Sequence, residues 1–311
     1  MKNNNPFAFY SAQLIERILR SKKQKDPALW LYQNDLRTPA FMMESLCRLF
    51  EKGLGNSNFG SANKLFKKLE DVLGQIDFYD AFYKEFKNNK KISPEVKAYI
   101  LKKRNKELDR LKKLLCKKGG LEKRIKEFDS YVKAQKINFD SATIKKIEIA
   151  LENEITLIKE LVRETKGNFT KMEEEIHELR RKMRWLSIYG VSLQGVIKLE
   201  TNHKKESWDK KYLTKNIIEL PFNKLPVHNF PAHIFYNRNH FYALSWLIFE
   251  LGQIKDIGFR IEFLVKVIRK TSDVSSESAE KKAEIALGVK ENEPALFKHA
   301  SRICKDFFEK D

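Results

Sequence analysis

The sequence predicts an all-α protein made of two helical bundles related by an internal pseudo-twofold repeat, with an irregular insert at about 201–235. Three observations predict this fold class. Apolar residues recur at helical spacing along most of the chain, Gly (12) and Pro (8) are scarce among 311 residues, and one short segment occurs twice. With 42% hydrophobic residues the chain can bury a core, and its length suits a compound domain built from two similar halves. We expect the first bundle over 1–130 and the second over 131–311.

The first half contains a long helix that begins near Ser93. The run Ser93-Pro94-Glu95 supplies a cap residue, a proline at the first helical position and an acid in the first turn. Leucines follow at intervals of seven, three and four residues, and Gly119-Gly120 ends or interrupts the helix. The leucines of this face are Leu101, Leu108, Leu111 and Leu115.

Helical spacing continues in the second half. Isoleucines and leucines repeat along 141–165, and Gly167-Asn168 then breaks the pattern. A further long helix is predicted from Thr170 toward Leu199. The order of helices therefore resembles that of the first half.

The insert at 201–235 departs from this pattern. It has no sustained helical period and contains three prolines, so we expect an ordered loop with a short strand or hairpin. Helical spacing resumes over 236–270. After a Ser-rich linker, one or two more helices are expected over 276–308.

The repeated segment is short but occurs in the same context in each half. Leu-Gly-Gln-Ile, followed within two residues by Asp, stands at 73–77 and again at 251–256. A Leu-Arg pair lies upstream of each copy, at Leu36-Arg37 and at Leu179-Arg180. The matching order predicts a duplicated helical unit.

The charge balance points to a polyanionic partner. Lys and Arg number 61 against 42 Asp and Glu, which gives a net charge of +19. Such a surplus causes self-repulsion that a polyanion would relieve. Nucleic acid, an anionic membrane and inorganic polyphosphate are the candidates.

The cysteines and the hydropathy pattern indicate a soluble cytoplasmic protein. Three cysteines lie far apart and form no disulfide framework, which is typical of a reducing compartment. Charged residues occur too early for a secretory leader, and no apolar run approaches the ~18 residues of a membrane-spanning helix. We therefore expect no membrane span. The cysteines are Cys47, Cys116 and Cys304.

One predicted helix carries a basic stripe. Residues 101–126 contain twelve Lys or Arg and three acids. Five of the basic residues recur at spacings of three and four and share one face over about 21 Å. Like charges at this spacing repel one another, and a polyanion would neutralise them and release counterions. An ordinary solvated face is the alternative. The five are Lys103, Lys106, Arg110, Lys113 and Lys117.

A second basic cluster lies on the helix predicted from Thr170. Four of its residues share one helical face, namely His177, Arg180, Arg181 and Arg184. The planar fork of arginine donates two hydrogen bonds to two phosphate oxygens at once. A histidine beside it can also donate, and a nearby phosphate would raise the pKa of that histidine. The alternative is plain intrahelical pairing with the glutamates at 173–175.

The pattern His177-x-x-Arg180-Arg181-x-x-Arg184, followed by an apolar helix, resembles the signature helix of the CHAD (conserved histidine α-helical domain) family. The run at 251–256 resembles the Leu-Gly-x-x-basic-Asp segment of that family. CHAD domains consist of two helical bundles, each with a basic motif helix and a Leu-Gly helix, so the resemblance covers nearly the whole chain. It implies a non-enzymatic protein that binds inorganic polyphosphate through a basic central surface.

The first half departs from the family pattern. Asn34 stands where the family histidine would be, and Phe41 and Met42 occupy the following basic positions. Asp77 stands where the second copy has Lys255. Arg37 keeps its charge and is included among the expected polyphosphate contacts, although we expect its replacement to be the milder change.

The expected function is non-enzymatic binding of inorganic polyphosphate in a basic groove formed by helices of both bundles. The alternative is sequence-nonspecific binding of the phosphate backbone of duplex nucleic acid. Single-stranded nucleic acid would need exposed aromatic rings, which the basic stripes largely lack. An enzyme acting on polyphosphate would need acids to hold Mg²⁺, and the stripes contain few. We expect no cofactor and no metal, and a cytoplasmic location that includes association with polyphosphate granules.

Overall fold

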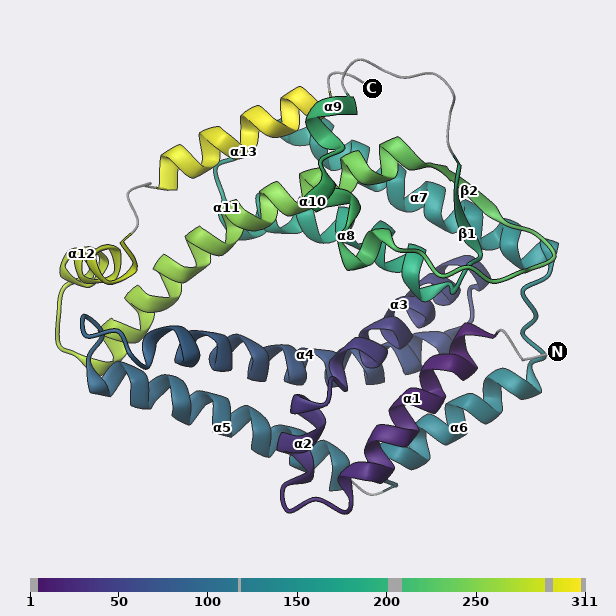
Figure 1. Ribbon diagram of the computed structural model, residues 1–311, viewed down its shortest axis with the longest axis horizontal. Helices are drawn as coiled ribbons and strands as arrows, with labels where there is room; N and C mark the ends of the chain where they lie inside the picture. Colours follow the sequence, from purple (N-terminus) through teal and green to yellow (C-terminus); the bar gives the residue numbers. More distant parts are fainter. Residues whose placement is uncertain (1–4, 117–118, 201–208, 289–292, 309–311) are drawn as a thin grey trace. The chain divides into compact units, whose positions relative to one another are not determined.

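The structure is a computed structural model that describes residues 5–116, 119–200, 209–288 and 293–308 (Figure 1). The described residues are mostly helical, as the sequence predicts, and their only sheet has two strands. None of the helices in these ranges is both long and apolar enough to cross a membrane.

The chain divides into two compact units. Unit 1 comprises Met1–Ala150, Val191–Val196 and Pro226–His233, and unit 2 comprises the remaining segments. The expected boundary after residue 130 falls inside unit 1, because the loop after residue 134 and the first part of the next helix pack there. Two short segments of the expected second half also return to unit 1.

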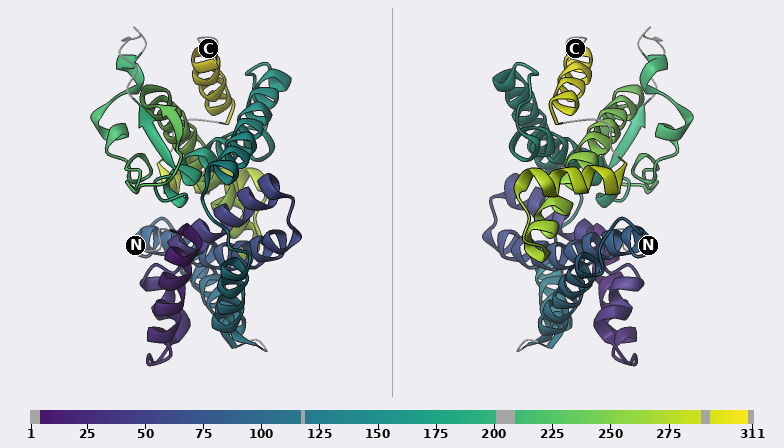
Figure 2. Two further views of the ribbon diagram at one scale, coloured as in Figure 1. Left: turned by 90° about the vertical axis from the view of Figure 1, so that its right-hand side faces the viewer. Right: turned by 90° about the vertical axis from the view of Figure 1, so that its left-hand side faces the viewer.

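The described regular elements of unit 1 are all helices. The helices are α1 (Pro6–Ser21), α2 (Pro27–Gln33), α3 (Arg37–Leu54), α4 (Ser57–Phe86), α5 (Pro94–Cys116), α6 (Gly120–Ala134) and the start of α7 (Ser141–Thr165). Helix α4 lies between α3 and α5, and α1 lies beside α6 (Figures 1 and 2). Gly119, with φ of 92°, separates α5 from α6, which confirms the predicted interruption of the helix.

The core of unit 1 is rich in phenylalanine. Phe7 of α1 packs edge-on against Phe50 of α3, with ring centroids 4.9 Å apart. Phe59 and Phe128 extend this cluster to α4 and α6. All four side chains are buried, so the aromatic cluster packs four helices together.

Unit 2 is built around one long helix, α11. Its elements are the end of α7, the π-helical turn η1 (Met172–His177), α8 (Glu178–Ser192), β1 (Ile197–Glu200), α9 (Asp209–Tyr212), α10 (Lys215–Ile218), the 3-10 turn η2 (Pro221–Asn223), β2 (Ile234–Asn237), α11 (Arg238–Thr271), α12 (Ser276–Leu287) and α13 (Glu293–Phe308). Helix α11 contacts η1, α9, α12 and α13. Buried leucines of α11, such as Leu247 and Leu251, form the centre of this core.

The insert is irregular and contains a short strand, as predicted, but the helix before it is shorter than expected. The helix expected to reach Leu199 ends at Ser192, because the chain turns at Gly195, where φ is 98°. A Cβ at Gly195 would lie 2.6 Å from the backbone nitrogen of His228, so a larger residue cannot follow this path. Strand β1 then pairs with β2 in parallel, with Ile197 opposite Ile234. Of the two alternatives, the short strand is therefore confirmed as β2, and the hairpin is wrong, since the strands of a hairpin are antiparallel.

Candidate functional site

Arg180 of α8 lies against the middle of α11 at Gly252. A Cβ at Gly252 would lie 2.9 Å from Nε of Arg180 and 3.0 Å from Nη2, so the glycine provides the space for this guanidinium. The Nε atom donates a 3.0 Å hydrogen bond to the carbonyl oxygen of Ile248. Burial lowers the pKa of Arg180, and the nearby Asp256 carboxylate opposes that change. Arginine keeps its proton under these conditions, so a partly dehydrated positive charge is held at a fixed place.

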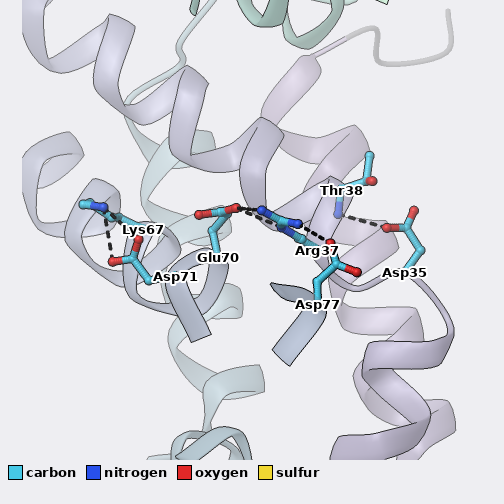
Figure 3. A network of polar contacts seen from close by, with 7 residues as sticks. All are labelled: Asp35, Arg37, Thr38, Lys67, Glu70, Asp71 and Asp77. Atoms are coloured by element: carbon cyan, nitrogen blue, oxygen red, sulfur yellow. Dashed lines mark hydrogen bonds and ion pairs between the residues drawn. The ribbon is translucent and has the colours of Figure 1, made fainter. Parts of the chain in front are cut away.

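Unit 1 contains a local arrangement of the same kind. A Cβ at Gly74 of α4 would lie 3.0 Å from Nη2 of Arg37. The guanidinium of Arg37 lies between two carboxylates, Glu70 and Asp77, at 2.9 Å from each (Figure 3). No described carboxylate lies within ion-pair distance of Arg180. The charge of Arg37 is therefore already neutralised, whereas that of Arg180 is not.

The segment at 34–38, which corresponds in the first half to the start of the pattern at 177–184, differs from that pattern. Asn34 lies in the turn after α2, where its side-chain amide donates to the carbonyl oxygen of Trp30. Helix α3 begins only at Arg37, and the Asp35 carboxylate accepts a hydrogen bond from the backbone nitrogen of Thr38 (Figure 3). Asn34 is consequently engaged in local turn formation.

Arg180 and Arg184 line the same small pocket in unit 2. The pocket has a volume of about 230 Å³. Its walls come from α8, from η2 and from α11. This volume is below the roughly 300–1,000 Å³ of pockets that hold drug-sized ligands, so it suits a group as small as one phosphoryl group. We call it the arginine pocket; besides the two arginines it is lined by Ser187, Leu220, Pro221, Phe222, Asn223, Ser245, Ile248 and Phe249.

Two aromatic residues of the arginine pocket were not among the predicted site residues. The guanidinium carbon of Arg184 lies 5.9 Å from the ring centroid of Phe222, which the insert contributes. Phe249 is 42% exposed. Phe249 lies three residues before Gly252 on α11, and this spacing was a signal for its place near Arg180.

His177 ends the π-helical turn η1, immediately before α8. Its ring lies 5.5 Å from that of Phe259, and its Nδ1 atom is buried with no hydrogen-bond partner among the described residues. Burial lowers the pKa of His177, while Glu173, 4.0 Å from Nε2, acts in the opposite direction. The positive charges of Lys255, Arg180 and Arg181 lower this pKa further.

Arg181 is exposed and already paired with an acid of its own helix. Its side chain is 54% exposed and pairs with Glu178 at 2.7 Å. Of the predicted alternative partners at 173–175, Glu173 lies 4.0 Å from His177, and Glu175 accepts hydrogen bonds from the backbone nitrogens of Thr170 and Lys171. Asp256 is 62% exposed and pairs with Lys255 at 2.8 Å.

The predicted basic stripe on α5 lies in unit 1, and only some of its side chains are exposed without an acidic partner among the described residues. Lys106 and Lys113 are exposed, and Lys103 lies over the ring of Tyr99 at 5.3 Å. Arg110 is exposed but pairs at 2.6 Å with the buried Glu107. Lys117 lies outside the described residues.

A buried ion pair on α5 was missed in the sequence. Arg104 pairs at 2.9 Å with Asp80 of α4, which is 5% exposed. Asp80 also pairs with Lys84 and accepts a hydrogen bond from the Tyr32 hydroxyl. These cations stabilise the ionised carboxyl and hold its pKa low, although burial acts against them. Arg104 is therefore a structural residue beside the predicted stripe.

The two basic clusters belong to different units, so their predicted meeting in one groove stays a prediction. Among the described residues, no three His, Cys, Asp or Glu side chains gather closely enough to hold a metal ion. Comparisons with protein-family models, with curated proteins and with solved structures gave no match.

Proposed function

We propose that this protein binds inorganic polyphosphate without hydrolysing it, with the arginine pocket of unit 2 as its main contact and the exposed lysines of α5 as a second one. The observation that carries the proposal is the pairing of Arg180 and Arg184 in one pocket of about 230 Å³. Arginine forks recognise phosphate oxygens by paired hydrogen bonds, and partial burial strengthens that attraction.

The state of Arg180 supports anion binding at this place. Its guanidinium is partly dehydrated and has a carbonyl oxygen as its hydrogen-bond partner, which leaves donors for a further acceptor. A phosphoryl oxygen would satisfy those donors and balance the charge. The CHAD-like order of motifs and the net charge of +19 support a ligand that carries many such groups.

Arg37 has a smaller part in this proposal. An anion at Arg37 would have to displace Glu70 or Asp77, each 2.9 Å from the guanidinium. The local likeness of Arg37 on Gly74 to Arg180 on Gly252 supports a duplicated helical unit of which only the second copy keeps a ligand site.

Nucleic-acid binding is the second candidate, and one observation favours it. The exposed ring of Phe249 and the ring of Phe222 line the same pocket as the two arginines, so a base could stack beside a bound phosphate. The pocket volume favours polyphosphate, because the pocket accommodates a phosphoryl group more readily than a whole nucleotide.

The experiment measures competition for one labelled site. A fluorescent long-chain polyphosphate is bound to the full chain, and unlabelled polyphosphate, duplex RNA and single-stranded DNA are added as competitors. We expect unlabelled polyphosphate to compete best and no orthophosphate to be released. Replacing Arg180 and Arg184 with Ala should weaken polyphosphate binding by roughly a hundredfold, because two charge-assisted contacts are lost.

The matched control replaces two bases that already pair with acids on α6. Lys123 lies 3.8 Å from Glu127, and Lys126 lies 2.5 Å from Glu122. Lys123→Ala with Lys126→Ala should weaken polyphosphate binding by less than roughly fivefold. Equal losses in the two double variants would indicate diffuse electrostatic attraction. Tight binding of single-stranded DNA or of duplex RNA without binding of polyphosphate would favour the second candidate.

A further inference from the structure

A second pocket lies within unit 1. It contains neither arginine of the arginine pocket, and Lys112 is the one lysine of α5 among its lining residues. It has a volume of about 1110 Å³ and lies where the link between α1 and α2 approaches the end of α5 and the start of α6. This volume slightly exceeds the roughly 300–1,000 Å³ of pockets that hold drug-sized ligands. We call it the α1–α6 pocket.

The floor of the α1–α6 pocket is apolar. Ile18 of α1 and Leu121 of α6 are buried, and Leu115 of α5 is half-buried. Side chains of this kind exclude water and bind hydrocarbon through the hydrophobic effect. A bare phosphate chain would gain nothing from them, so the pocket is suited to a ligand that has an apolar part.

The rim of the α1–α6 pocket is basic. Five lysines line it against three acids, which leaves two positive charges in excess. Glu122 forms ion pairs with both Lys22 and Lys126, each at 2.5 Å, and Lys112 pairs with Asp26 at 3.2 Å. The five lysines are Lys22, Lys25, Lys112, Lys123 and Lys126.

Lys25 differs from the other lysines of the rim. It is exposed, and no carboxylate in the described ranges lies within ion-pair distance of it. An ammonium group without a partner at the edge of an apolar pocket attracts a carboxylate or another singly charged anion. We propose that the α1–α6 pocket binds an anionic amphiphile with one long acyl chain, of the class of long-chain carboxylates. The acyl chain lies against the apolar floor, and the carboxylate lies at Lys25.

Cys116 provides a reporter inside this pocket. It lines the α1–α6 pocket and its thiol is exposed, whereas Cys47 and Cys304 are buried. Burial raises the pKa of the other two thiols, which keeps them protonated and unreactive. The rate of alkylation by iodoacetamide therefore reports on Cys116, and a bound acyl chain should protect it.

The first experiment measures this protection with palmitate, below the concentration at which it forms micelles. Palmitate should slow alkylation of Cys116, and the uncharged methyl ester should do so less. Across a series of saturated carboxylates, affinity should rise about fourfold for each added methylene until the pocket is filled. Protection by butyrate as strong as by palmitate, or no protection by palmitate, would overturn the proposal.

The second experiment uses matched variants and measures palmitate binding by calorimetry. Cys116→Trp fills the pocket from its edge and should abolish binding, while Asn105→Trp places the same ring on an exposed position of α5 outside the pocket and should not. Lys25→Glu should weaken binding by roughly fivefold or more, and Lys23→Glu, which alters a nearby exposed lysine that does not line the pocket, by less than twofold. Equal effects within either pair would contradict the proposed site.

Competition separates this proposal from the proposed function. Polyphosphate and an acidic amphipathic peptide are added to the palmitate complex, and alkylation of Cys116 is followed. Neither should displace palmitate. Displacement by polyphosphate would assign the pocket to the polyphosphate surface, and displacement by the peptide alone would assign it to a protein partner; either result would overturn the proposal. The double variant of Arg180 and Arg184 should bind palmitate normally.

Discussion

Single glycines position the arginines of this protein. Gly74 and Gly252 lie in the interiors of long helices, where glycine costs about 1 kcal/mol relative to alanine. Each leaves space for one guanidinium, of Arg37 or of Arg180. The neighbours then decide the chemistry, because Glu70 and Asp77 neutralise Arg37 while Arg180 bonds to a carbonyl oxygen.

Gly252→Ala tests this positioning role. The new Cβ would displace the Arg180 guanidinium from the Ile248 carbonyl, while the better helix propensity of alanine offsets the strain. We expect the free energy of unfolding to change by no more than about 1 kcal/mol. Polyphosphate affinity should fall by roughly tenfold, because one charge-assisted contact is lost. Fluorescence titration measures this affinity.

Gly74→Ala is the matched control, since its Cβ would meet Arg37 in the same way. Affinity should stay within roughly twofold of the parent protein. Similar losses in both variants would contradict the view that only the second arginine contacts the ligand.

Glu44 is a buried acid whose ionisation weakens the fold. It is 5% exposed, and its Oε2 atom has no hydrogen-bond partner among the described residues. Burial, reinforced by the Glu70 carboxylate, raises the pKa of Glu44 from 4.5 to about 7. The folded state therefore holds this proton more tightly than the unfolded state does. The resulting stabilisation is full below pH 4.5 and is lost as the pH rises through about 7.

Glu44→Gln should remove this dependence. The free energy of unfolding of the variant minus that of the parent should rise by about 2–3 kcal/mol between pH 4.5 and pH 8. Urea denaturation at each pH measures both free energies. Glu174→Gln, which alters an exposed carboxylate, is the control. A pH-independent difference between Glu44→Gln and the parent would refute the assignment.

At the scale of elements, the insert forms one wall of the arginine pocket. The 3-10 turn η2 carries Phe222 over Arg184. Its position is fixed by Asn223, whose amide donates at 2.7 Å to the Ile217 carbonyl oxygen and whose Oδ1 accepts at 2.6 Å from the Ser245 hydroxyl. The insert is thus an ordered part of the site, held to α10 and to α11.

Asn223→Ala should loosen this wall. The Ile217 carbonyl would lose its buried donor, and the Ser245 hydroxyl would keep only its bond to Phe241. We expect the free energy of unfolding to fall by about 1–3 kcal/mol in chemical denaturation. Asn105→Ala, at an exposed position of α5, should have little effect. If Asn223→Ala leaves the free energy of unfolding unchanged, η2 is held by other contacts.

At the scale of the whole molecule, the net charge of +19 sets how binding responds to salt. Each phosphate contact releases counterions, so the logarithm of the affinity should fall linearly with the logarithm of the salt concentration. Replacing Arg180 and Arg184 together should reduce that slope by about two, one for each lost contact. The measurement is a titration at several salt concentrations. A slope that stays the same in the double variant would mean that these arginines do not touch the polyanion.

Local patterns allowed the helices to be predicted. The helix after Ser93 begins at Pro94, and a Gly with positive φ separates α5 from α6, as cap residues and helix breakers indicate. The basic character of α5 and α8 also follows from residue spacing alone. These features depend on neighbours within a few residues, which the sequence displays directly. The duplicated bundle plan, the family resemblance and the ligand stay predictions.

The tertiary structure decided which charges are available. Spacing placed four basic residues on one face of a helix, but it could not show that Arg180 meets Gly252 or that Arg181 pairs with Glu178. Parallel pairing of β1 and β2 and the place of Phe222 beside Arg184 depend on contacts across tens of residues. The physical reason is that helical periodicity determines which side chains share a face, whereas burial, desolvation and ion pairing depend on what packs against that face.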